Sequence, residues 1–90
     1  MAQLYKADVT IEEFPEPANG TDYSLEEMRA AIGGGWIETV QTKDGRVMVV
    51  DEEGKLKEFP RNAAATELYV FGDQDPIVGD ALVFDKGQMR

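Results

Sequence analysis

The sequence predicts an α+β fold, a small and mostly antiparallel sheet of four to five strands with two short helices. Ninety residues leave room for one core, so we expect a single domain over residues 1–90 with its core at about 4–84. Several short stretches alternate apolar and polar residues, as half-buried strands do. Two other stretches begin with helix-capping residues and are suited to a helix by apolar spacing or alanine content.

The first strand is expected around Tyr5–Ile11, where apolar residues alternate with charged or polar ones. Residues 13–20 contain two prolines and an Asn-Gly pair, which predict a loop. Ser24 and Glu27 have the spacing of a capping box and start the first helix, whose apolar stripe runs along one face. Gly33 is the natural residue to end that helix, because glycine enters the left-handed region without penalty.

A hairpin follows, with strands at Trp36–Gln41 and Arg46–Val50 and a turn at Lys43–Gly45. The second of these strands is apolar on both faces, which indicates the centre of a sheet. A turn over residues 52–54 leads to a predicted short strand, Lys55–Phe59.

Asn62 is a suitable N-cap for a second helix over Ala63–Tyr69, and a loop follows at residues 73–76. The last strand is expected at Ile77–Phe84, and residues 85–90 as a tail. The predicted order is β-α-β-β-β-α-β, with both helices over one face of the sheet.

Composition excludes several classes of function. The chain has no cysteine and no histidine, so disulfides, thiolate or imidazole zinc sites and histidine-based catalysis are excluded. The acidic stretches at residues 51–53 and 73–75 do not continue into a calcium-binding loop. We therefore expect a protein that is not an enzyme, with no catalytic residue, no metal and no cofactor.

Charge and hydropathy limit the partners. No apolar run approaches the ~20 residues of a membrane helix, and the first residues do not resemble a signal peptide, so we expect a cytoplasmic protein without membrane contact. The formal charge of −9 repels phosphate backbones and argues against direct nucleic-acid binding. Residues 1–27 carry a net −6 and residues 28–70 only −1, so an anionic ligand is still compatible with the middle of the chain.

Two segments are candidates for ligand binding. Trp36, the only tryptophan, and Glu38 are two residues apart on a predicted strand, so a ring for stacking and a carboxylate acceptor would share one face. Arg61, Asn62 and Thr66 stand at the start of the second helix, where backbone N–H groups and a guanidinium can hold an anion. The ordinary explanations, a core aromatic and a plain N-cap, are commoner.

The run Gly33-Gly34-Gly35 is not a phosphate-binding loop, because it follows a helix and no Lys-Ser or Lys-Thr pair comes after it. A helix stop and a close crossing of the backbone explain it better.

Four segments together resemble a family found in bacteriophages and mobile elements, domain of unknown function 3846. They are Ile32 to Glu38, Val49 to Leu56, Pro60 to Thr66 and Ile77 to Val83. Members often have tyrosine or another aromatic at the position of Trp36 and leucine at that of Phe59. The resemblance implies a phage or plasmid origin, in a bacterial host, and brings no activity or catalytic residue.

Three functions stay open. The first is a non-enzymatic binding protein that sequesters a nucleotide-like defence signal of the host. The second is an acidic protein–protein inhibitor, with nucleic-acid mimicry as one form, that occupies a basic site of a host protein. The third is an accessory interaction domain that binds through an uncovered sheet edge or forms a homodimer.

Overall fold

The computed structural model describes residues 2–89, which form one antiparallel sheet with the strand order β2-β1-β5-β4-β3. The strands are β1 (Ala2–Tyr5), β2 (Ile11–Phe14), β3 (Ile37–Gln41), β4 (Val47–Asp51) and β5 (Ala81–Phe84). The helices are α1 (Leu25–Ala31) and α2 (Ala63–Leu68), with short 3₁₀ turns η1 (Gly72–Gln74) and η2 (Lys86–Gln88). The predicted α+β class, with five strands and two helices among residues 2–89, is confirmed.

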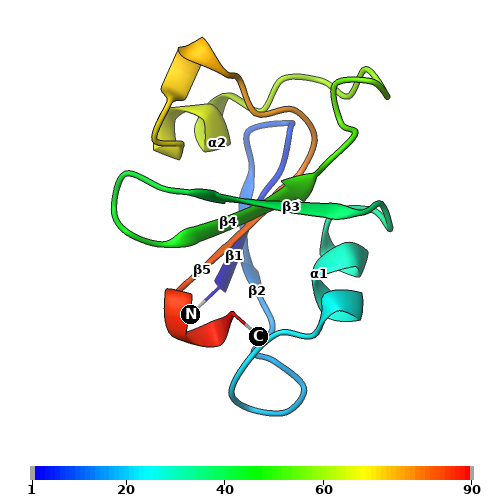
Figure 1. Ribbon diagram of the computed structural model, residues 1–90, viewed down its shortest axis with the longest axis vertical. Helices are drawn as coiled ribbons and strands as arrows, with labels where there is room; N and C mark the ends of the chain where they lie inside the picture. The colour runs from blue at the N-terminus through cyan, green and yellow to red at the C-terminus, as the bar shows by residue number, and fades with distance from the viewer. Residues whose placement is uncertain (1, 90) are drawn as a thin grey trace.

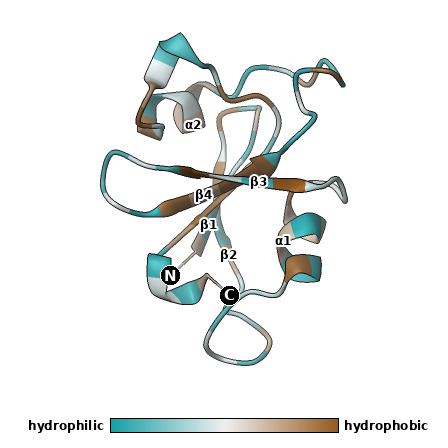
Figure 2. Cartoon of the chain, in the orientation of Figure 1, coloured by the Kyte–Doolittle hydropathy of each residue, from teal (hydrophilic) through white to brown (hydrophobic). Residues whose placement is uncertain are grey.

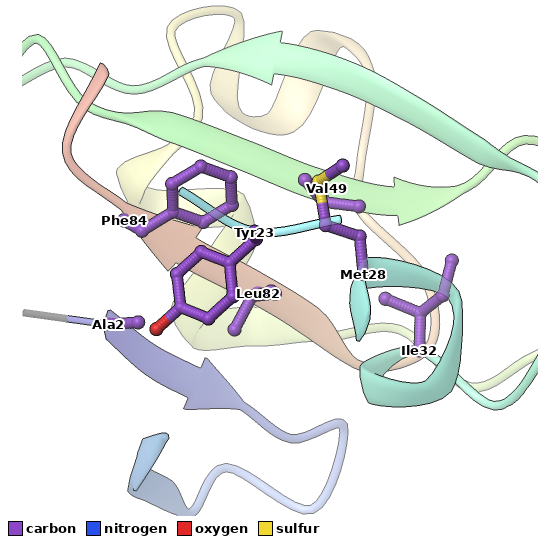
Figure 3. Packing of buried hydrophobic residues seen from close by; sticks show 7 residues of the cluster. All are labelled: Ala2, Tyr23, Met28, Ile32, Val49, Leu82 and Phe84. Atoms are coloured by element: carbon purple, nitrogen blue, oxygen red, sulfur yellow. The ribbon is translucent and has the colours of Figure 1, made fainter. Parts of the chain in front are cut away.

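The two helices cover opposite faces of the sheet, which corrects the expectation that both lie over one face (Figure 1). On the α1 face, Met28 and Ile32 pack against Leu82 and Phe84 (Figure 3). On the α2 face, Ala65 and Tyr69 pack against other residues of the same central strands. Those residues are Met48, Val50, Ala81 and Val83.

The two central strands explain why each face of the sheet is covered by a helix. β4 and β5 are apolar at successive positions, and side chains along a strand alternate between faces, so both faces need cover. All four residues of β5 are buried. In Figure 2 the most hydrophobic colour follows these strands, whereas the tip of the β3–β4 hairpin is hydrophilic.

The predicted first strand is instead a hairpin, β1 and β2 joined by a turn over residues 6–10. Within that turn the Lys6 N–H donates to the Thr10 carbonyl at 2.8 Å, and Asp8 Oδ1 accepts from the Thr10 N–H at 3.0 Å. Val9 has φ of +68°. Alternation of apolar and polar residues does not reveal such a turn, because Val9, at its tip, continues the alternation that a strand would show.

The predicted strand Lys55–Phe59 is wrong, because residues 52–58 form consecutive turns. The Lys57 N–H donates to the Glu53 carbonyl at 3.0 Å, and the Phe59 N–H to the Gly54 carbonyl at 3.1 Å. These local bonds satisfy the backbone without a partner strand. Leu56, in the middle, is 82% exposed.

Residues 85–89 do not form a tail. The Tyr23 N–H donates to the Gln88 carbonyl at 2.9 Å, and Met89 packs against the α1-face core. The last strand also begins later than expected, at Ala81 rather than Ile77. Residue 90 lies outside the described residues.

Local signals in the sequence are confirmed. Ser24 and Glu27 make the reciprocal bonds of a capping box, and Gly33 follows α1 with φ of +97°. The Asp44-Gly45 turn joins β3 and β4, with Gly45 at φ of +86°. No helix within residues 2–89 is both long enough and apolar enough to cross a membrane.

Candidate functional site

Trp36 and Glu38, predicted to act together, belong to different surroundings. Trp36 precedes β3, is 56% exposed, and has the Arg29 guanidinium of α1 over its ring at 4.2 Å from the centroid. Arg29 is held there by bonds to the carbonyls of Gly34 (2.8 Å) and Gly35 (3.1 Å). Glu38 instead lines a pocket on the α2 side of the sheet, where its strand neighbour Val40 also lies.

Asn62 and Thr66 are buried, and their polar atoms bond to the protein itself. The Asn62 side chain accepts from the Ala65 N–H at 3.0 Å and donates to the carbonyls of Tyr5 and Gly79, each at 2.8 Å. The Thr66 hydroxyl donates to the Asn62 carbonyl at 2.7 Å and accepts from the Ile77 N–H at 2.9 Å. Through these bonds the two residues together connect α2 to β1 and to the segment that contains Ile77 and Gly79.

Arg61 is exposed and forms an ion pair with Asp73 of η1. The structure therefore brings Arg61, Asn62 and Thr66 together at the start of α2, as expected, but does not place Trp36 or Glu38 beside them. Glu38 alone of the five predicted binding residues lines the pocket described next. The binding roles of all five stay predictions.

The pocket lies on the α2 side of the β3–β4 hairpin and has a volume of about 130 Å³. Buried or half-buried apolar residues that line it include Val40, Val50 and Ile77. Tyr69, at the end of α2, lines it as well and is itself buried. Exposed side chains that line it are Glu38, Glu52, Lys55 and Leu56.

The charges around the pocket are mostly negative. Lys55, the only cation among its lining residues, forms an ion pair with Asp75. That pairing lowers the pKa of Asp75, and the Tyr69 hydroxyl, 3.4 Å from Asp75 Oδ2, contributes in the same direction. Burial raises the pKa of Tyr69, as do the charges of Asp75 and Glu38, so its hydroxyl stays protonated at neutral pH. Among residues 2–89, Glu38 and Glu52 have no cationic partner.

Asp51, at the end of β4, also lines the pocket, but its carboxylate is committed to the fold. Its side chain is 4% exposed and lies 2.8 Å from Lys57 Nζ, while Oδ1 accepts from the Glu53 N–H at 2.8 Å. The residue organises the turn that forms one wall of the pocket. It adds no free charge to the rim.

The sequence predicts a binding role for Glu38 but none for Tyr69, Asp75 or Val40. Asp75 lies in an acidic stretch that predicts a loop, and Tyr69 is expected only as the end of a helix. Nothing local signals their meeting, because the pocket joins β3, β4, the end of α2 and residues 75–78, which are far apart in sequence. Within residues 2–89 no group of three or more carboxylates is arranged to hold a metal ion.

Comparison with protein families gives a match to the family described as "Domain of unknown function (DUF3846)", over residues 6–89. Comparison with curated proteins and with solved structures gives no match. The family match covers nearly the whole described chain, including both helices and most of the sheet. The chain belongs to the DUF3846 family.

Proposed function

We propose that this protein is a non-enzymatic binding protein whose pocket accepts a positively charged side chain of a partner protein. The observation that carries the proposal is the pocket itself, with apolar residues inside it and, at its rim, the carboxylates of Glu38 and Glu52, which have no cationic partner within residues 2–89. Lys55 does not offset them, because Asp75 engages it.

The size of the pocket favours one side chain over a whole small molecule. Its volume of about 130 Å³ lies below the ~300–1,000 Å³ usual for small-molecule sites. Arginine and lysine combine a charged end with an apolar stem. Such a side chain would place its stem against Val40 and Val50 and its charge beside Glu38.

The charge of the chain supports the same partner. The formal charge of −9 attracts a basic protein surface over a distance of about one Debye length, ~8–10 Å in physiological salt. If the chain comes from a phage or mobile element, as its family resemblance implied, the partner is a cytoplasmic protein of the bacterial host. The protein would then act by occupying a basic site of that partner.

Sequestration of a nucleotide-like signal stays an untested prediction that these surroundings support less. A phosphate would meet carboxylates at the pocket, and Arg61, the cation proposed for it, is paired with Asp73. Trp36, the proposed stacking residue, lies against Arg29 of α1.

The test is a titration with N-acetyl-arginine amide, a cationic side chain without an extended backbone, followed by NMR of the labelled protein. We expect shifts in the amide signals of Glu38, Val40 and Tyr69, and weaker binding as salt rises. Glu38→Gln should weaken binding several-fold, since it removes a charge at the rim. Glu13→Gln, an equal change on exposed strand β2, is the matched control. Shifts that avoid the pocket, or equal binding by both variants, would refute the proposal.

A further inference from the structure

Within residues 2–89, the outer edge of β3 has backbone groups without strand partners. The Glu52 N–H donates to the Trp36 carbonyl at 2.9 Å and the Thr42 N–H to the Arg46 carbonyl at 3.2 Å, so even-numbered residues of this hairpin bond across to β4. Bonding in an antiparallel pair alternates from residue to residue. The N–H and C=O groups of Ile37 and Thr39 therefore point outward.

The molecule covers only one end of this edge. The Val70 N–H donates to the Gln41 carbonyl at 3.2 Å, and the Lys43 N–H donates to the Leu68 carbonyl at 2.8 Å. Residues 68–70 thus pair with the last part of β3 and the residues after it, as a short antiparallel bridge. The first part, around Ile37 and Thr39, has no such cover among residues 2–89.

The opposite edge of the sheet, formed by β2, is less suited to pairing with an added strand. β2 is a four-residue strand whose exposed Glu12 and Glu13 are adjacent, and charges on an edge strand discourage pairing with another chain. The outward position at the middle of β3 is the uncharged, exposed Thr39. Of the two edges, β3 is the better template for an added strand.

Each face of the sheet has a hollow beside this edge. On the α2 face lies the pocket that Glu38 lines. On the α1 face, Thr39, Gln41 and Met89 line a shallower hollow of about 350 Å³, with Lys86 at its side. Side chains of an added strand would alternate between these two hollows, because successive residues of a strand point to opposite faces.

We propose that an extended segment of the partner protein adds to the edge of β3 as a sixth strand, with basic residues at alternate positions. The proposal rests on the function proposed above and specifies how the partner is held. Backbone bonds to Ile37 and Thr39 provide part of the affinity, and an arginine or lysine opposite Glu38 enters the pocket. Residues of the segment opposite Thr39 face the α1 side, where the positive charge of Lys86 disfavours another basic residue.

Charge complementarity identifies this occupant rather than a second copy of the chain. Two copies each carrying a formal charge of −9 would bring Glu38 of each chain to the same interface. A basic segment reverses that repulsion. The added strand also supplies hydrogen-bond partners to the outward backbone groups of Ile37 and Thr39.

The test uses a peptide of about eight residues, a normal strand length, in which arginine alternates with threonine. In the proposed register the threonine backbone bonds to β3, whereas the arginine N–H groups point away. N-methylation of the threonines should therefore weaken binding at least about tenfold, as the loss of one or more backbone bonds implies. N-methylation of the arginines should leave the affinity nearly unchanged.

In the protein, Thr39→Pro removes one outward N–H, and Glu13→Pro makes the same change at the other edge as a control.

Four outcomes are distinct. Loss of affinity on threonine N-methylation and in Thr39→Pro, with slowed exchange of the Ile37 and Thr39 amides, supports the added strand. Binding that depends on Glu38 but ignores both N-methyl patterns overturns the added strand and leaves the cation pocket standing. Absence of binding by every basic peptide overturns both proposals. A concentration-dependent dimer that Thr39→Pro converts to monomer assigns the edge to a second copy and overturns this one.

Discussion

Gly35 lies so close to Asp51 that a Cβ atom on the glycine would stand 2.2 Å from Asp51 Oδ2. Asp51 has little freedom to move, because its side chain is 4% exposed and bonded to Lys57 and to the Glu53 N–H. The third glycine of the run after α1 is thus explained by the close approach of a side chain, whereas the sequence predicted a close crossing of the backbone. Its backbone has no positive φ, so the contact rather than the conformation demands glycine.

Gly35→Ala should therefore lower the free energy of unfolding by about 1–3 kcal/mol, the usual cost of forcing extra volume into a packed site. Urea denaturation measures it. Gly87→Ala is the control, since a Cβ there meets nothing within 4 Å and the backbone has no positive φ. If both alanine variants unfold at the same urea concentration, the contact with Asp51 is not a constraint.

Val9→Asn should stabilise the protein by about 1 kcal/mol. Val9 has φ of +68°, where a β-branched side chain is strained and asparagine is tolerated. The residue is 63% exposed, so little apolar contact is lost. Ile11→Asn, at a 50% exposed position of β2, removes an apolar side chain without relieving φ and should not stabilise. Thermal unfolding of both variants checks this, and no gain in Val9→Asn would contradict it.

Asn62→Ala should cost about 2 kcal/mol or more, which exceeds the ~1 kcal/mol typical of a helix cap. Besides capping α2, the amide donates to the carbonyls of Tyr5 and Gly79, and the alanine would remove these two donors from a part-buried and a buried contact. Ser24→Ala removes the half-buried cap of α1 and serves as the comparison. Equal losses in the two variants, measured in urea, would show that Asn62 acts only as a cap.

The pKa of Asp44 in the β3–β4 turn is lowered from 3.8 to about 2, chiefly by hydrogen bonds from Arg46 and Thr42. A lowered pKa in the folded state means that the carboxylate stabilises the fold above the unfolded value, and that this contribution is lost as pH falls from 3.8 to about 2. The contribution is small, because the side chain is 47% exposed.

Arg46→Gln should raise the pKa of Asp44 toward its ordinary value, as measured by NMR titration of the carboxyl carbon. Asp44→Asn should remove the corresponding acid dependence of stability. Lys43→Gln is the control for a change of charge in the same turn. A titration midpoint for Asp44 that Arg46→Gln does not move would refute the assigned cause.

Much of the fold could be predicted because its signals are local. The capping box of Ser24 and Glu27 and the Asp44-Gly45 turn act over a few residues, so the sequence alone locates them. The strand predicted at Lys55–Phe59 failed because alternation near Leu56 was not accompanied by burial. The hairpin of β1 and β2 was missed because Val9 occupies a backbone conformation that valine normally avoids.

By itself the sequence determined the α+β class, the exclusion of cysteine and histidine chemistry, and the positions of the helix caps. Tertiary structure alone decided that α1 and α2 cover opposite faces and that Glu38 lies in a pocket with Tyr69 and Asp75. The physical reason is the distance along the sequence over which the interactions act. Caps and turns depend on backbone bonds within a few residues, whereas the pocket and the open edge of β3 depend on which distant strands pair.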